Sequence, residues 1–169
     1  KPMLLLMAPS GVNKGQITPT QLVIVDEQQN IIDGKGRASA ETTLHIEIIK
    51  KLKCSAVLHT HSIYATVLSD HFEKQSAIRL EGWEMLKGIK GISTHQTSID
   101  IPIVANNQNM KELSRAAYNY LNDNIPGILV AGHGLYAWGD SLGEAQRHVE
   151  ILEFLFSAIW HKQLLPPVQ

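Results

Sequence analysis

The sequence predicts an α/β domain in which helices cover the faces of a mixed sheet. A chain of 169 residues, 44% hydrophobic and 18% charged, has the size and composition of one globular domain. Strand-like apolar runs alternate with segments of helical periodicity, which favours helices packed against a sheet. Short polar turns between neighbouring strand-like runs indicate hairpins, so the sheet should also contain antiparallel pairs.

The first part of the chain is expected to consist mainly of strands and turns. Apolar runs predict strands at residues 3–8, 22–26 and 31–32, with a polar turn at residues 9–15. The first run is apolar throughout, which is typical of a strand covered on both faces. Ser39 then has the short polar side chain of a helix N-cap, and Leu44, Ile48 and Leu52 follow at helical spacing.

The central part contains one strand that ends in histidines. Residues 55–58 form a short, mostly apolar strand that leads into His59 and His61. Ser62 can cap a following helix that reaches residue 69. A further helix is expected at residues 83–87.

The C-terminal part alternates between strands and helices. The pattern predicts strands at residues 99–104, 128–131 and 135–138, and helices at residues 109–122 and 141–164. Pro102 indicates that the first of these strands lies at a sheet edge or that the strand ends there. Asn109 and Ser141 are the expected N-caps, and each is followed three residues later by a glutamate, as in a capping box.

Three histidines form the strongest candidate site. Residues two apart on a strand point to the same face, so His59 and His61 present two imidazoles together. His133 lies between Gly132 and Gly134, which let the backbone approach a ligand. Three imidazoles leave a zinc ion an open position, as in catalytic rather than structural zinc sites. Iron, manganese or cobalt can also bind such ligands, and chance can produce the spacing in a chain with 8 histidines.

Other polar residues are candidates for the same chemistry. The turn that contains Ser10, Gly11 and Lys14 can donate hydrogen bonds to an anion such as phosphate. An exposed lysine is, however, more often only a solubilising charge. Glu81 and Glu84 can move protons, although two carboxylates at this spacing more often form a solvated surface.

Composition argues against several other classes of protein. The formal net charge of -1 gives no reason to expect a polyanionic partner. No apolar run is long enough to span a membrane. Cys54 is the one cysteine, so an internal disulfide is excluded and a reducing, cytoplasmic environment is expected. We predict that Cys54 is a buried structural thiol.

Four motifs together resemble those of the class II aldolase/adducin family. They are Pro9–Gly15, Ser39–Thr42, Leu58–Ser62 and Gly132–Gly134, and they occur in the family's order and spacing. The resemblance covers essentially the whole chain. Within the family, the segment Leu80–Ile89 and the stretches at residues 94–96 and 101–104 are similar to members that dehydrate a methylthio-pentulose phosphate.

The resemblance implies a fold and a set of site residues. The implied fold is a three-layer α/β/α sandwich around a central mixed, largely antiparallel sheet. One zinc ion per subunit is implied at His59, His61 and His133. Glu84 matches the catalytic acid/base of the dehydrating members, and Glu41 matches the general carboxylate of the family's aldolases. The residues expected to bind the substrate phosphate are Ser10, Gly11, Lys14 and Ser39.

The implied reaction is the loss of water from 5-methylthioribulose 1-phosphate. Its product is 2,3-diketo-5-methylthiopentyl 1-phosphate, and the pathway is methionine salvage, a route of methionine biosynthesis. Members of the family form homotetramers with sites between subunits. They also carry a leading helix and a glycine-rich phosphate loop, so we expect residues 1–169 to be a single domain that lacks both.

Two alternatives follow from the same residues. Aldol cleavage or epimerisation of a sugar phosphate, such as fuculose 1-phosphate or ribulose 5-phosphate, would use the same metal with Glu41 in place of Glu84. A non-catalytic scaffold, like the head domain of adducin, should have lost metal ligands. All three histidines are present here, and a purified protein without bound metal would favour that second alternative.

Overall fold

The structure is a computed structural model that describes residues 2–166. Its main sheet has five strands in the order β4-β8-β7-β6-β5. The strands are β4 (Ala56–Thr60), β5 (Ala77–Glu81), β6 (Ser98–Val104), β7 (Gly127–Val130) and β8 (Gly134–Gly139). Strands β6 and β7 run parallel, and the other neighbouring pairs of this sheet run antiparallel. The sheet is therefore mixed and largely antiparallel, as predicted.

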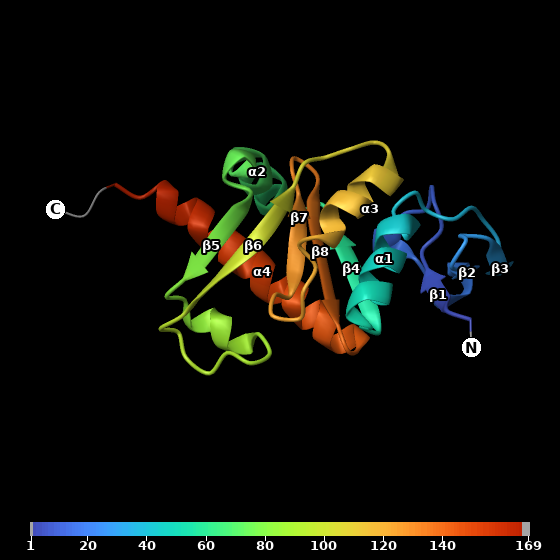
Figure 1. Ribbon diagram of the computed structural model, residues 1–169, viewed down its shortest axis with the longest axis horizontal. Coiled ribbons are helices and arrows are strands. Elements are labelled where there is room, and N and C mark those ends of the chain that lie inside the picture. The colour runs from blue at the N-terminus through green and yellow to red at the C-terminus, as the bar shows by residue number, and fades with distance from the viewer. Residues whose placement is uncertain (1, 167–169) are drawn as a thin grey trace.

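Helices cover both faces of the main sheet and produce three layers (Figure 1). They are α1 (Thr42–Leu52), α2 (Ile63–His71), α3 (Met110–Tyr118) and α4 (Leu142–Gln163). On one face, Leu68 of α2 and Phe156 of α4 belong to one buried apolar cluster. On the other face, Leu44 of α1 and Leu113 of α3 belong to a second cluster. The predicted α/β/α sandwich is confirmed.

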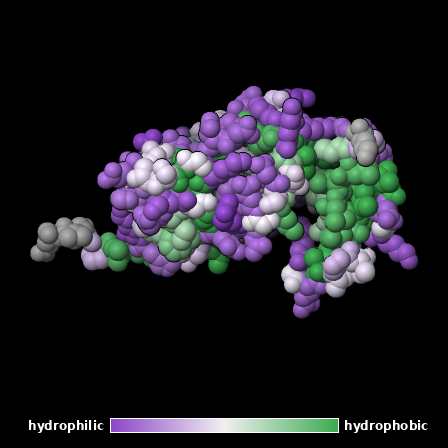
Figure 2. Space-filling view, turned by 90° about the horizontal axis from the view of Figure 1, so that it is seen from below, coloured by the Kyte–Doolittle hydropathy of each residue, from purple (hydrophilic) through white to green (hydrophobic). Residues whose placement is uncertain are grey.

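A separate three-stranded antiparallel sheet lies at the N-terminal end of the molecule. It consists of β1 (Leu4–Met7), β2 (Val23–Asp26) and β3 (Ile31–Asp33), with the 3-10 helices η1 (Lys14–Gln16) and η2 (Pro19–Gln21) between β1 and β2. The prediction that the first strand is covered on both faces is wrong. Val23 and Val25 are fully buried, but Leu4 and Leu6 are 53% and 61% exposed, because only one face of this sheet packs against the chain. Figure 2 shows the resulting hydrophobic surface at this end.

The region between α2 and β6 differs most from the prediction. Residues 77–81 form β5, which we did not predict, although Ile78 and Leu80 are buried and Arg79 is exposed as strand alternation requires. After η3 (Glu73–Gln75) and β5, the expected helix is the 3-10 helix η4 (Glu84–Gly88). Pro102 lies within β6, an interior strand, opposite the first residue of β5 and before the pairs with β7 begin.

The helix N-termini follow from their capping side chains. Ser62, Asn109 and Ser141 each accept a backbone N–H of the first turn, as predicted. The expected cap at Ser39 is wrong, because α1 begins at Thr42 and the Ser39 hydroxyl instead accepts the N–H of Glu41 at 3.3 Å. The turn that precedes α1 therefore places Glu41 at the N-terminal end of the helix rather than inside it.

Cys54 lies in the core, two residues before β4 begins. Its side chain is buried, as predicted, and burial raises the pKa of the thiol to about 11. At neutral pH the thiol is protonated, and a protonated thiol is a poor nucleophile. Among residues 2–166, no helix combines the length and the apolar character needed to span a bilayer.

Gly134 allows β8 to approach the end of β4, and its replacement provides a test of that contact. A Cβ atom at Gly134 would collide with the backbone carbonyl of Thr60. We expect Gly134→Ala to lower the free energy of unfolding by about 1–3 kcal/mol or more, as overpacking does. Gly143→Ala is the control, because a Cβ atom there meets no atom within 4 Å. Urea denaturation measures both variants, and an unchanged midpoint for Gly134→Ala would contradict the close approach.

Candidate metal centre

The pairing of β4 with β8 brings distant histidines together. His59 is the fourth residue of β4, and His61 follows the end of that strand. Thr60 lies opposite Leu135 in the antiparallel pair, and His133 is two residues before Leu135 in the tight turn between β7 and β8. Strand register therefore places a residue 74 positions away in sequence beside His59.

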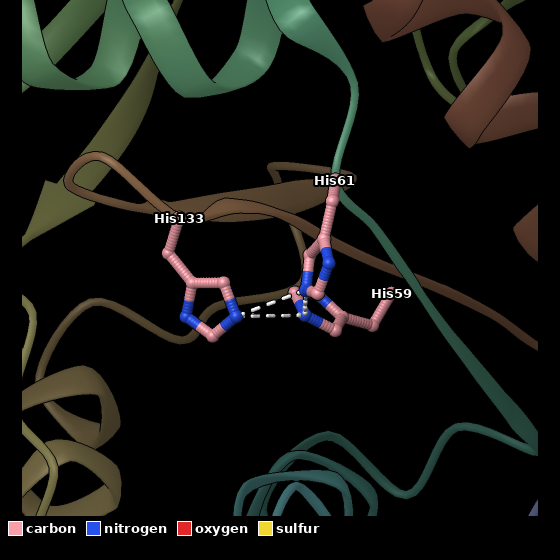
Figure 3. A group of neighbouring side chains, drawn as sticks. All are labelled: His59, His61 and His133. Carbon is pink, nitrogen blue, oxygen red and sulfur yellow. Dashed lines mark hydrogen bonds between the residues drawn. The ribbon is translucent and has the colours of Figure 1, made fainter. Parts of the chain in front are cut away.

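The three imidazoles point their Nε2 atoms at one another (Figure 3). The Nε2 atoms are 2.8 Å apart between His59 and His61, 3.0 Å apart between His61 and His133, and 3.3 Å apart between His59 and His133. The exposed ring is that of His61, so the group can be reached from solvent. The structure thus brings together the three residues predicted as metal ligands.

The hydrogen bonding of His59 tests whether a cation fits this group. The Nδ1–H of His59 donates to the carbonyl oxygen of Leu135 at 2.8 Å, so its Nε2 carries a lone pair in the neutral ring. That lone pair faces two further ring nitrogens at close range. A divalent cation between the three nitrogens removes the repulsion between lone pairs, and a neutral imidazole is the form that binds a metal.

Burial keeps the three rings in the metal-binding form. Burial lowers the pKa of His59 to about 3, helped by the neighbouring His61 and His133. The pKa values of His61 and His133 are lowered as well, in both cases chiefly by burial. All three imidazoles are therefore neutral at pH 7, and protons compete only weakly with a metal ion.

Glu41 is the carboxylate next to the histidines. Its Oε1 lies 3.8 Å from the Nε2 of His133. Its other oxygen accepts a hydrogen bond from the hydroxyl of Tyr136, a fully buried residue of β8. The Tyr136 ring in turn stacks on the ring of His59, with 3.9 Å between centroids and 16° between planes. Tyr136 therefore fixes the positions of the carboxylate and of one candidate ligand together.

The environment of Glu41 favours the protonated form of its carboxyl group. Burial raises the pKa of its carboxyl group, and the positive charge that His61 carries when protonated, together with that of Lys14, opposes that rise. The backbone of Glu41 is also held, because the Nδ1 of His45 lies 2.9 Å from its carbonyl oxygen. His45 is buried beside the centre and supports it without being among the converging nitrogens.

Three of the four residues predicted to bind phosphate lie in or near the segment that leads to Glu41. The backbone N–H of Ser10 donates to the carbonyl of Arg37 at 2.8 Å, which holds the turn at residues 9–15 against that segment. Gly11 is exposed in this turn and has a φ of +79°. The positive charge of Lys14 is close enough to lower the pKa of Glu41. Ser39, buried, contacts the backbone of Glu41.

Glu84 lies at the opposite edge of the sheet from the histidines. The C-terminal ends of β4 and β7 lie at the same end of the strands as the histidines. Strand β5 runs antiparallel to β6, so its C-terminal end, just before η4, lies at the opposite end of the strands (Figure 1). The Glu84 side chain is 70% exposed and pairs with Lys87 at 2.7 Å. This hydrogen bond lowers the pKa of Glu84. Within one chain, therefore, the structure does not bring Glu84 to the candidate metal centre.

Tyr136 is a site residue that the sequence analysis did not identify. Its register partner across the β4–β8 pair is His59. The available signal was a tyrosine in a fully apolar strand directly after Gly134, because a buried tyrosine hydroxyl requires a hydrogen-bond partner. Nothing local in the sequence indicates that this partner is Glu41, which lies 95 positions earlier.

Comparison with known proteins places the chain in a family. The family model described as the class II aldolase and adducin N-terminal domain matches residues 2–160. The chain belongs to this family. Among class II aldolase-type relatives, the methylthioribulose-1-phosphate dehydratase of Stenotrophomonas maltophilia (strain K279a) is 42% identical over 149 residues, which cover 87% of this chain and 70% of the relative. The dehydratase of Hahella chejuensis (strain KCTC 2396) is 39% identical over 151 residues, covering 88% and 73%.

Solved structures of class II aldolases share the fold. An L-fuculose 1-phosphate aldolase superposes with a TM-score of 0.75 at 24% identity, covering 98% of this chain and 73% of the aldolase. The L-fuculose-1-phosphate aldolase of Thermus thermophilus gives a TM-score of 0.70 at 24% identity, covering 94% and 78%. The two aldolases therefore support the class II aldolase architecture of the chain, whereas the more similar dehydratases bear on its reaction.

Proposed function

We propose that this protein is a methylthioribulose-1-phosphate dehydratase, a lyase that removes water from 5-methylthioribulose 1-phosphate in methionine salvage. The observation that carries the proposal is the 42% identity to a dehydratase of that name over 87% of the chain. The convergence of three neutral imidazoles supports a metal-dependent reaction. The product is 2,3-diketo-5-methylthiopentyl 1-phosphate.

We assign His59, His61 and His133 as the ligands of a divalent metal, and zinc fits three imidazole nitrogens well. When bound, the metal supplies Lewis-acid polarisation of the substrate's ketone, which acidifies the neighbouring C–H bond. The roles that remain fall to side chains. A carboxylate must take the C3 proton, and the C4 hydroxyl leaves as water after it has gained a proton.

We assign the removal of the C3 proton to Glu84 of a neighbouring copy of the chain. The Glu84 carboxylate is ionised because its pKa is lowered, so it can accept a proton. It borders an apolar recess of about 330 Å³ lined by Trp83, Met85, Gly88 and Phe154, which suits a methylthio group. Since Glu84 and the histidines lie at opposite edges of one chain, a site at a subunit interface is required, and a homotetramer would provide it.

The positions of the remaining candidate residues are compatible with phosphate binding. Ser10, Gly11, Lys14 and Ser39 lie along the approach to Glu41, where a phosphate would meet backbone donors and one lysine charge. We propose that they hold the substrate phosphate. The single, buried Cys54 thiol is consistent with a reducing compartment such as the cytoplasm.

A second function has one observation in its favour. Glu41, and not Glu84, is the carboxylate 3.8 Å from His133 within a single chain. Class II aldolases or epimerases that act on a sugar phosphate would use Glu41 with the same metal. The distinction between the two functions is therefore a distinction between two carboxylates and two substrates.

A substrate panel tests the proposed function. We expect the zinc-loaded protein to convert methylthioribulose 1-phosphate to a diketone, detected by mass spectrometry as a loss of water. Fuculose 1-phosphate and ribulose 5-phosphate should react at least ~10²-fold more slowly, because a site shaped for one substrate discriminates by at least this factor. Faster cleavage of fuculose 1-phosphate or epimerisation of ribulose 5-phosphate would instead establish the second function.

A further inference from the structure

A carboxylate outside the candidate metal centre binds both neighbours of His61. Glu153 of α4 accepts a hydrogen bond from the hydroxyl of Thr60 at 2.8 Å and another from the hydroxyl of Ser62. The two hydroxyls flank His61 in sequence. Side chains alternate along an extended chain, so Thr60 and Ser62 point away from the face that His59 and His61 share.

Ser62 extends this contact into α2. While its hydroxyl donates to Glu153, its oxygen accepts the backbone N–H of Ala65 at 3.0 Å and caps the helix. The N-terminus of α2 is thus held in place by α4. Among the described residues, Glu153 has no cationic partner within ion-pair distance, so these two hydroxyls are its hydrogen-bond donors.

Helix α2 also holds the turn that carries His133. The hydroxyl of Thr66 donates to the carbonyl of His133 at 3.1 Å. The hydroxyl of Ser69 donates to the carbonyl of Val130 at 3.2 Å and accepts the N–H of Gly132 at 3.1 Å. The α2 helix therefore links both segments that supply the three imidazoles, and Glu153 anchors the end of the helix where that link begins.

We propose that Glu153 is a positioning residue for the candidate metal centre. Its carboxylate holds the side-chain hydroxyls on both sides of His61 directly, and it holds the His133 turn through α2. The proposal rests on the proposed function, because it assumes that the three imidazoles bind a metal. Hydrogen bonds to an ionised acceptor are about twice as strong as neutral ones, so one charge can hold this network rigid. Metal sites depend on such outer contacts to orient their ligands.

Metal affinity, rather than activity, is the direct test. The metal-free protein is titrated with Zn²⁺ in competition with a chromophoric chelator. We expect Glu153→Gln to weaken zinc binding by about 10–100-fold, the usual effect of losing an outer-shell partner. Thr60→Val, which removes one hydroxyl and keeps the side-chain shape, should weaken binding in the same direction. The control is Glu150→Gln, which makes the same charge change at an exposed position of α4 bonded to Gln146.

Two further readouts separate positioning from general stability. The absorption spectrum of the Co²⁺-loaded protein reports ligand geometry, and we expect it to change in Glu153→Gln but not in Glu150→Gln. If Glu153→Gln melts at a lower temperature yet binds zinc and Co²⁺ like the wild type, the proposal is overturned. If Glu153→Gln does not fold, unchanged zinc affinity in Thr60→Val overturns it. A wild-type protein that binds no divalent metal would overturn the metal centre itself, together with this proposal.

Discussion

Replacing His133 with alanine is expected to abolish stoichiometric metal binding and nearly all turnover. The structure places its Nε2 within 3.3 Å of both other candidate nitrogens, so the variant retains two ligands where three are needed. A metal ion contributes several kcal/mol of transition-state stabilisation, so its loss should lower the rate on the order of 10³-fold or more. Metal content per chain, measured by emission spectroscopy after gel filtration, should fall below about 0.1.

The matched control removes an imidazole that does not belong to the centre. His161 is an exposed residue near the end of α4, so His161→Ala should keep both the metal and the activity. Removing metal from the wild type with a chelator should reproduce the His133→Ala phenotype, and added Zn²⁺ should reverse it in the wild type alone. Full activity in metal-free wild-type protein would show that the three imidazoles serve another purpose.

Subunits that lack Glu84 are expected to be rescued by subunits that lack His133. Glu84→Gln alone should lower turnover by about 10²–10⁴-fold, the usual contribution of a general acid/base. In mixed oligomers, an intact site needs histidines from one copy and Glu84 from its neighbour. When equal amounts of the two variants assemble at random, the chain that supplies the histidines has His133 with a probability of one half, and its neighbour has Glu84 with a probability of one half. About a quarter of the sites are then intact, so activity should recover to about a quarter of the wild-type value. Steady-state rates after co-refolding provide the measurement.

The control for rescue pairs Glu84→Gln with a chain that carries both substitutions. No intact site can form in that mixture, so its activity should stay at the level of the single variants. Glu81→Gln, which changes a nearby exposed carboxylate at the end of β5, should retain activity without mixing. A mixture of the two single variants that is no more active than its parents would rule out a Glu84 contribution from a neighbouring copy.

Predictions that depend on local chemistry agreed with the structure. The caps at Ser62, Asn109 and Ser141 are found because a short polar side chain satisfies free N–H groups wherever the next residues can form a helix. Errors arose where packing overrides local signals. Ser39 contacts the backbone before α1 rather than capping the helix, and the apolar first strand remains half-open because nothing in the described chain covers its outer face.

The sequence by itself determined the layered fold, through its alternating strands and helices, and the three candidate ligands, through imidazoles placed two apart on a strand and between two glycines. Tertiary structure decided how these residues are combined. The register of β4 on β8 sets His133 beside His59 and places Tyr136 between His59 and Glu41. Strand direction places Glu84 at the opposite end of the strands from the histidines, and the path of α4 brings Glu153 to the hydroxyls of Thr60 and Ser62. These contacts join positions far apart in sequence, and only the pairing and packing of whole elements fixes them.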